Sequence, residues 1–229
     1  MLTKSSKKTA GRPAEIGQSQ ILDAAELLFS EQGYDGATTR ALAKVASCNI
    51  AMISYYFGSK DGLYQAVLQR HFERSKKLLS SGNFTQAQLL KAWPQLKGYE
   101  EREFCASLFE FGKSILSHTP IHKIIQREMM SGGEKLVNAL IKSDAGVYKP
   151  LSKKIEALKK SGHLQSELDI RFAAVSLLGP MIYSTTCGRV LKDVYGFSKL
   201  DELWMKSLCL HLTKSLFHGY GNTEQVLSK

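Results

Sequence analysis

Three aromatic residues, Tyr55, Tyr56 and Phe57, stand side by side at the end of a short apolar segment, and Lys60 follows them. An exposed tyrosine offers a DNA groove a flat apolar ring and a hydroxyl. A second tyrosine hydroxyl can hydrogen-bond a phosphate, and a lysine at the start of a helix can do likewise. The stretch therefore has the side chains that a DNA contact requires.

Thr39 and Arg40 form a second group of this kind, at the expected start of a short helix. Free backbone N–H groups and the helix dipole favour a phosphate at such a position. The alternative is that these residues are solvated polar side chains on an ordinary helical bundle. The pattern alone leaves that alternative open.

The elements that carry these residues are predicted from helical periodicity and capping residues. A helix over 19–33 has one apolar face and stops at Gly33. Thr38, Asn49 and Ser59 can each cap a following helix, of which the last is long and extends to about residue 80. The inward positions of these helices are Ile21, Leu22, Ala25, Leu28, Phe29, Leu42, Ala43, Ala46, Ile53, Phe57, Leu63, Val67 and Phe72.

Two short helices joined by a tight turn over 38–57 are typical of a helix-turn-helix, whose second helix can enter the DNA major groove. Cys48 occupies an apolar slot in the turn, where a small core residue is expected rather than a reactive thiol. The residues predicted to bind DNA lie on the outer face or at its rim. They are Thr39, Arg40, Asn49, Ile50, Ala51, Ser54, Tyr55, Tyr56 and Lys60.

The segment ILDAAELLFSEQGYDGATTRALAKVASCNIAMISYYFGSKDGLY, residues 21–64, resembles the DNA-binding domain of the TetR family of bacterial transcriptional regulators. The resemblance implies an all-helical homodimer with a C-terminal domain that binds an effector and dimerises. It also implies that Thr39, Arg40, Tyr56 and Lys60 contact phosphates or nearby bases. Two positions depart from the family pattern, because Ser47 stands where glycine is common and Ser54 where tyrosine is frequent. The rest of the chain loosely resembles the CecR branch of this family.

Beyond residue 81 the pattern is again helical, and the predicted fold class is all-α. The predicted domains are a basic flexible arm over 1–18, a helix-turn-helix domain over 19–65 with a linking helix to about 80, and an effector-binding and dimerisation domain over 81–229. Helices are expected over 85–93, 100–118, 121–142, 147–161, 168–192 and 200–218.

The C-terminal part is predicted to hold a small apolar or amphipathic effector and to dimerise. The candidate pocket residues are Trp93, Phe104, Leu108, Phe111, Met129, Met130, Met181 and Tyr183. The alternative for each of them is ordinary core packing. The apolar faces over 172–191 and 203–217 could supply half of a four-helix dimer interface.

Composition agrees with a packed protein that has a polyanionic partner. The net charge is +10, with 43% hydrophobic residues, and the four cysteines lack the spacing of a zinc site or a disulfide framework. We expect no metal, although His118 and His122 are four residues apart, because Pro120 lies between them. The 17 uncharged residues over 172–188 are too few and too polar for a membrane span of about 20 residues.

No phosphate loop or hydrolase motif occurs in the sequence, so neither an enzyme nor a cofactor is expected. The leading hypothesis is a cytoplasmic, nucleoid-associated homodimeric regulator. It would be a ligand-responsive repressor that binds a palindromic operator. One rival is an activator or chromosome-organising protein without effector release. A more remote rival is a helical enzyme or carrier for an apolar compound.

Overall fold

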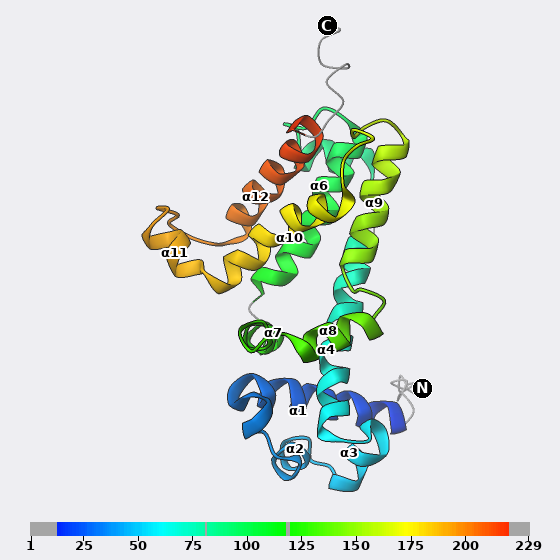
Figure 1. The fold of residues 1–229 in the computed structure, drawn as a ribbon, viewed down its shortest axis with the longest axis vertical. Helices are drawn as coiled ribbons and strands as arrows, with labels where there is room; N and C mark the ends of the chain where they lie inside the picture. The colour runs from blue at the N-terminus through cyan, green and yellow to red at the C-terminus, as the bar shows by residue number, and fades with distance from the viewer. Residues whose placement is uncertain (1–12, 81, 118–119, 220–229) are drawn as a thin grey trace, which may run out of the picture. The chain divides into compact units, whose positions relative to one another are not determined.

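The computed structural model describes residues 13–80, 82–117 and 120–219, and describes side chains from residue 17 onward. Every regular element in these ranges is a helix, and none of the described residues forms a strand (Figure 1). The prediction of an all-α fold is therefore confirmed. None of the described helices is long and apolar enough to cross a membrane.

The chain divides into two compact units that are not two successive stretches of sequence. The first unit is Met1–Leu68 with Lys123–Ala139, and the second is Gln69–His122 with Leu140–Lys229. The predicted division at residue 81 differs from this, because residues 123–139 hydrogen-bond to helices of the N-terminal part. Helical periodicity could not show a contact between segments so far apart in the sequence.

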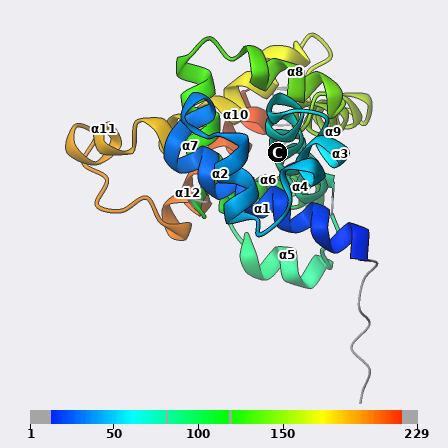
Figure 2. The same ribbon diagram turned by 90° about the horizontal axis from the view of Figure 1, so that it is seen from below.

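The first unit contains α1 (Pro13–Gly36), α2 (Thr39–Val45), α3 (Ile50–Phe57) and the first part of α4 (Lys60–Ser80) (Figures 1 and 2). Helix α1 begins earlier than the predicted residue 19, since Pro13 is well suited to a first helical turn. The remainder of the predicted arm, residues 1–12, lies outside the described residues. The core of this unit includes Ile21, Ala25, Leu28, Phe29, Leu42, Ala43, Ile53, Leu63, Val67 and Leu68.

Two predicted long helices are each divided in the structure. The helix expected over 121–142 becomes α7 (Pro120–Met130) and α8 (Glu134–Lys142), because Gly132 and Gly133 both adopt positive φ, at 97° and 75°. The helix expected over 168–192 becomes α10 (Ile170–Thr186) and α11 (Gly188–Asp193), with a break at Cys187. Helix α10 continues through Pro180.

The second unit is built around α6 (Tyr99–Leu116), which packs against α5 (Gln86–Ala92), α10 and α12 (Glu202–Lys214) (Figure 1). Helix α9 (Tyr148–Lys160) packs on α10, and a π-helical turn over Ser215–Gly219 follows α12. Leu79, Trp93, Phe104, Leu108, Ile155, Leu177, Met181 and Met205 belong to one buried apolar cluster. The central position of α6 explains why Phe104, Leu108 and Phe111 are all buried.

His71 on α4 and His122 on α7 meet edge to face within the second unit, with ring centroids 5.6 Å apart. Ser75 lies 3.5 Å from the His71 ring nitrogen, and Arg74 lies on the same helix. Burial, the neighbouring His122 and Arg74 together lower the pKa of His71 to about 4. The folded protein therefore holds this imidazole neutral at a pH where the unfolded chain protonates it.

We predict that stability falls with acidity more steeply in the wild type than in the His71→Gln variant. The unfolded chain takes up a proton as pH falls through about 6.5, whereas folded His71 does so only near pH 4. His71 should therefore contribute about 2–3 kcal/mol of stability that is present above pH 6.5 and is lost as pH falls towards 4. Denaturant unfolding at pH 7.5 and pH 5 measures this. Equal pH dependence in both proteins would contradict the assignment.

Candidate nucleic-acid interface

Each short helix of the first unit begins at the capping residue that the sequence predicted. The Thr38 side chain accepts a hydrogen bond from the Ala41 amide at 3.1 Å, and Asn49 accepts one from the Ala51 amide at 2.9 Å. The Gly62 amide donates to the Ser59 hydroxyl at 3.0 Å. Such caps satisfy backbone N–H groups that have no partner within the helix.

The outward face of α3 carries the predicted recognition residues. Ile53 is fully buried and ties the helix to the core, and Phe57 is partly buried beside it. Tyr55 is 82% exposed, and its ring meets that of Tyr56 edge to face at 5.1 Å. Ile50, Ala51, Ser54 and Asn49 are exposed with it, as is Arg40 on α2, whereas Thr39, Tyr56 and Lys60 are partly buried. The structure thus brings the nine predicted DNA-binding residues onto the two short helices and the start of α4.

The turn between α2 and α3 has a left-handed backbone at Ser47, one of the two positions that depart from the family pattern. Ser47 has φ of 52°, in the left-handed region that glycine adopts readily and serine adopts only at a cost in conformational energy. The Cys48 amide, next along the turn, donates to the Ala43 carbonyl at 3.0 Å. Burial raises the pKa of the Cys48 thiol, which suits a packing residue better than a nucleophile.

The turn between α3 and α4 depends on Gly62. A Cβ atom at this position would lie 1.9 Å from the Phe57 carbonyl oxygen, a backbone atom that cannot swing away. Glycine therefore lets the first turn of α4 approach the end of α3. The same close approach holds Lys60 beside the end of the recognition helix.

Lys60 is fixed by Tyr34, a residue that follows the bend at Gly33. The Lys60 ammonium donates to the Tyr34 carbonyl at 3.1 Å and stands 4.3 Å from the centre of the Tyr34 ring. An ammonium group has three N–H donors, so donors remain for a phosphate. Tyr34 was not among the predicted site residues.

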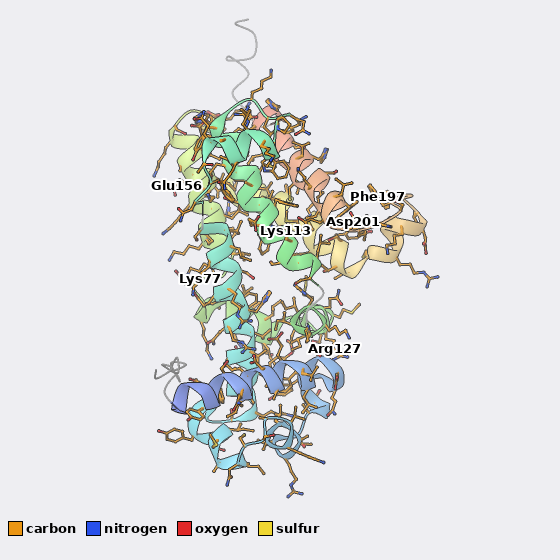
Figure 3. All side chains as sticks on the ribbon, turned by 180° about the vertical axis from the view of Figure 1, so that it is seen from behind. Lys77, Lys113, Arg127, Glu156, Phe197 and Asp201 are labelled. Atoms are coloured by element: carbon orange, nitrogen blue, oxygen red, sulfur yellow. The ribbon has the colours of Figure 1, made fainter. Side chains whose placement is uncertain are left out.

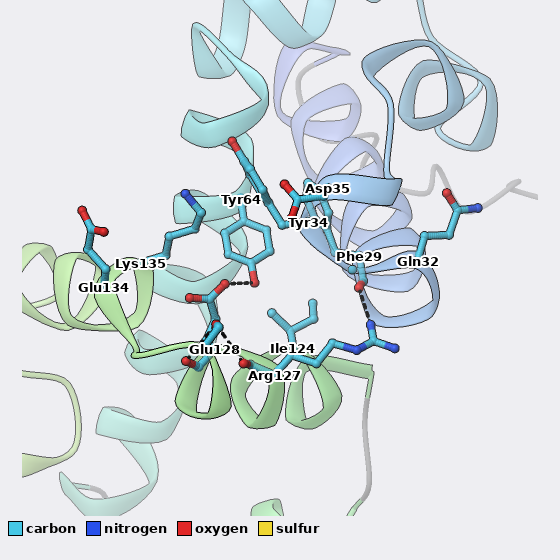
Figure 4. A pocket seen from close by; sticks show the side chains of 12 residues that line it. Phe29, Gln32, Tyr34, Asp35, Tyr64, Ile124, Arg127, Glu128, Glu134 and Lys135 are labelled. Atoms are coloured by element: carbon cyan, nitrogen blue, oxygen red, sulfur yellow. Dashed lines mark hydrogen bonds between the residues drawn. The ribbon is translucent and has the colours of Figure 1, made fainter.

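Residues 123–139 form hydrogen bonds to α1 and α4 of this unit. The Arg127 guanidinium donates to the carbonyls of Phe29, Ser30 and Glu31, at 3.1, 2.8 and 3.4 Å. Arg127 is labelled in Figure 3, and Figure 4 marks its bond to Phe29. These carbonyls precede Gly33, where α1 bends, so Arg127 supplies donors that the helix itself lacks there.

A buried hydrogen bond joins α7 to α4. The Tyr64 hydroxyl, on a side chain that is almost fully buried, donates to Glu128 Oε1 at 2.7 Å (Figure 4). Burial and the bond to Glu128 both raise the pKa of Tyr64, so the phenol stays protonated and remains a donor. A polar hollow of about 550 Å³ lies beside this pair and is lined also by Tyr34, Arg127 and Lys135.

The eight candidate pocket residues are divided by the structure. Trp93, Phe104, Leu108, Phe111 and Met181 belong to the buried cluster of the second unit, as the alternative of core packing expected. Met129 and Met130 belong to the first unit, and Met130 is 89% exposed. Tyr183 is exposed on α10. The candidate pocket residues are thus divided between the two units, and five of them are packed in the core of the second.

Three residues that matter for this surface were missed by sequence reasoning, namely Tyr34, Arg127 and Lys135. Arg127 lies 97 positions beyond Ser30, and no local sequence pattern predicts a contact between residues so far apart. The Gly132–Gly133 pair was a usable signal, since two adjacent glycines mark a turn. It would have shown that α7 ends near Met130.

His118 lies outside the described residues, so its predicted lack of a metal role remains a prediction. His122 faces His71, as described above. No group of three or more possible metal ligands occurs among the residues whose placement is described.

Two short crossed helices, a left-handed turn and an exposed second helix define a helix-turn-helix protein. The family model described as "Bacterial regulatory proteins, tetR family" matches residues 21–67. Residues 21–67 of this chain are therefore similar to the DNA-binding segment of this family.

Two curated relatives match parts of the chain. YttP of Bacillus subtilis (strain 168), a probable transcriptional regulator of the helix-turn-helix type, is 30% identical over 130 residues, which are 54% of this chain and 62% of YttP. CecR of Shigella flexneri, a dual transcriptional regulator, is 49% identical over 55 residues, which are 24% of either chain. The chain therefore covers less than two thirds of these relatives.

The fold as a whole resembles a solved structure. The transcriptional regulator FadR from Bacillus subtilis, in complex with stearoyl-CoA, aligns with a TM-score of 0.64 at 16% identity. The alignment covers 88% of this chain and 98% of FadR. At this identity the likeness concerns the fold alone.

We predict that the Gly62→Ala variant is destabilised more than the Gly58→Ala variant. An alanine at residue 62 would collide with the Phe57 carbonyl, and the backbone shift should cost about 3 kcal/mol. Gly58 has φ of 75° and ψ of −46°, which strains an L-residue, but no atom lies within 4 Å of the place that an alanine methyl group would take. Alanine there should therefore cost only the backbone strain, about 1–2 kcal/mol. Thermal and denaturant unfolding compare them. An equal or reversed order would contradict the role of Gly62.

Proposed function

We propose that the protein is a homodimeric transcriptional repressor that binds a palindromic operator and releases it when a small effector binds. The observation that supports this most directly is the exposed outer face of α3, with Tyr55 82% exposed on a helix locked to its core by Ile53. A helix of this kind fits the DNA major groove. Its place of action is the bacterial cytoplasm, where the chromosome lies.

The residues divide by the part of the duplex they meet. Ile50, Ala51, Ser54 and Tyr55 face the base edges, where apolar contacts and hydroxyl hydrogen bonds read sequence. Thr39, Arg40, Asn49, Tyr56 and Lys60 lie around this face and meet the phosphates. Phosphate contacts fix the position of the protein on DNA, and base contacts specify the sequence.

The dimer uses the exposed apolar face of the second unit. Phe172 and Val175 on α10 are 74% and 66% exposed, and Leu203 on α12 is 72% exposed. Phe197, labelled in Figure 3, precedes α12. A large exposed apolar surface is characteristic of a protein interface. Two-fold symmetry then presents two copies of α3 to half-sites that are about 34–36 Å apart or a multiple of that.

The effector is a small apolar or amphipathic compound held by the second unit. A mostly apolar hollow of about 250 Å³ is lined by Trp93, Phe109 and Lys206, among others, and the Lys206 ammonium stands 5.0 Å from the centre of the Trp93 ring. This combination suits an apolar body with a negative or polar end. By thermodynamic linkage, an effector that weakens DNA binding must itself bind less tightly to the DNA complex.

The proposal is tested by selecting genomic fragments that the purified protein retains and sequencing them. Inverted repeats beside promoters, with higher transcription of the adjacent genes when the protein is absent, are the expected result. Lower transcription in its absence would identify an activator instead. Failure to retain any fragment at low salt would contradict DNA binding and favour a helical enzyme or carrier.

We predict different losses for Tyr55→Ala and Lys60→Ala. Removing the Tyr55 ring should lower the preference for a selected site over random DNA by about tenfold, because it removes a base contact. Removing the Lys60 ammonium should weaken both DNAs alike and flatten the slope of log affinity against log salt by about one unit. Titrations at several salt concentrations measure both, with unfolding curves as the control for stability. Equal losses on both DNAs in both variants would contradict these roles.

We predict that Phe172→Glu weakens the dimer by about a hundredfold or more, because an interface would bury an unpaired carboxylate. Leu90→Glu is the matched control, since Leu90 is 53% exposed on α5 and outside the proposed interface. Sedimentation at a series of protein concentrations gives the dissociation constant of each. A monomeric wild type, or a dimer indifferent to Phe172→Glu, would contradict the interface.

A further inference from the structure

The first turn of α4 carries opposite charges next to each other. Lys60 is a predicted phosphate contact, and Asp61 follows it with its side chain 53% exposed. An acidic residue in the first turn stabilises a helix by its interaction with the helix dipole. The same carboxylate repels a phosphate. Asp61 therefore stabilises the helix but weakens the attraction between this turn and DNA.

Lys135, on α8, lies against this turn from a segment outside the helix-turn-helix. Its ammonium donates to Asp61 Oδ1 at 3.2 Å. It also stands 4.3 Å from the centre of the Tyr34 ring, and Figure 4 shows Lys135 and Tyr34. The Lys60 ammonium is at the same distance from that ring centre. One tyrosine ring therefore attracts two lysines, one of which neutralises Asp61.

The position of Lys135 is fixed by buried contacts. The Gln65 side-chain amide, on a residue only 4% exposed, donates to the Lys135 carbonyl at 3.1 Å. The Tyr64–Glu128 hydrogen bond holds the preceding helix. Partial desolvation lowers the pKa of Lys135, but the hydrogen bond and the charge of Asp61 outweigh it, and the pKa is raised. Lys135 is therefore a cation at neutral pH.

We propose that Lys135 is a positioning residue for DNA binding: it neutralises Asp61 and shares the Tyr34 ring with Lys60, so that the first turn of α4 meets a phosphate as a net cation. This inference rests on the proposed DNA-binding function. It gives residues 123–139, which lie outside the matched family segment, an indirect part in DNA affinity. Lys135 acts through Asp61 and does not itself contact DNA.

The variant that tests this should still fold. Asp61 and Lys135 are both partly exposed, and ion pairs of that kind contribute at most about 1 kcal/mol to stability. Binding of the full-length protein to a random-sequence duplex at low salt isolates the phosphate contribution from sequence reading. The double-mutant cycle compares four proteins: the wild type, Lys135→Ala, Asp61→Asn and the double variant.

Lys135→Ala should weaken binding to this duplex by about fivefold, because it exposes an unpaired carboxylate to the phosphates. In the Asp61→Asn background the same substitution should change affinity by less than about twofold. The salt slope should stay within about half a unit of the wild-type slope, since no phosphate contact is lost. Lys135→Arg should bind as the wild type does.

Lys123→Ala is the matched control, because Lys123 is an exposed lysine of the same segment. An equal loss from Lys123→Ala, or an equal effect of Lys135→Ala with and without Asp61, would show a general charge effect and overturn the proposal. A slope lower by about one unit would show direct phosphate contact and would also overturn it. A wild type that binds no duplex would instead contradict the proposed function, and the inference would fail with it.

Discussion

The close approach of Gly62 to the Phe57 carbonyl is the constraint on which the proposed DNA-binding surface depends. A side chain at residue 62 would have no space, so α3 and α4 can meet at this tight turn only because glycine is there. The turn connects Tyr55, near the end of α3, to Lys60, the first residue of α4, within one unit. Burial of Leu63 and Val67, both at 0% exposure, then anchors α4 to the core that also holds Ile53. Tyr55, the proposed groove contact, and Lys60, the proposed phosphate contact, are thereby anchored to the same core.

The first part of α4 is in contact with more than the helix-turn-helix. Tyr64 binds Glu128 of α7, Gln65 binds the backbone of Lys135 in α8, and Arg127 binds the carbonyls near the end of α1. Moving α7 would leave Glu128 without its hydrogen-bond donor in a buried position, at a cost of about 1–3 kcal/mol. Since α4, α7 and α8 each continue into the second unit, a change there has a covalent route to these contacts.

The sequence was most informative where a residue interacts with its own neighbourhood. Thr38, Asn49 and Ser59 could be identified as caps because each bonds to an amide two or three residues on. The bend at Gly33 and the left-handed Ser47 were likewise accessible, since both concern local backbone freedom. The contacts of Arg127 and Lys135 were not accessible, because they join residues 70 or more positions apart. For Phe104 and Met181, an apolar pattern could not distinguish a packed core from a ligand pocket.

The discontinuous first unit has a consequence for how the protein is made. Its helix-turn-helix is complete by residue 68, but the residues that bond to α1 and α4 lie between Lys123 and Ala139. During translation at about 5–20 residues per second, the N-terminal helices leave the ribosome several seconds before their partners. Until then the carbonyls that Arg127 will bind are open to water, and Tyr64 has no carboxylate partner. The nascent chain thus reaches its mature DNA-binding form only after more than half of it has been synthesised.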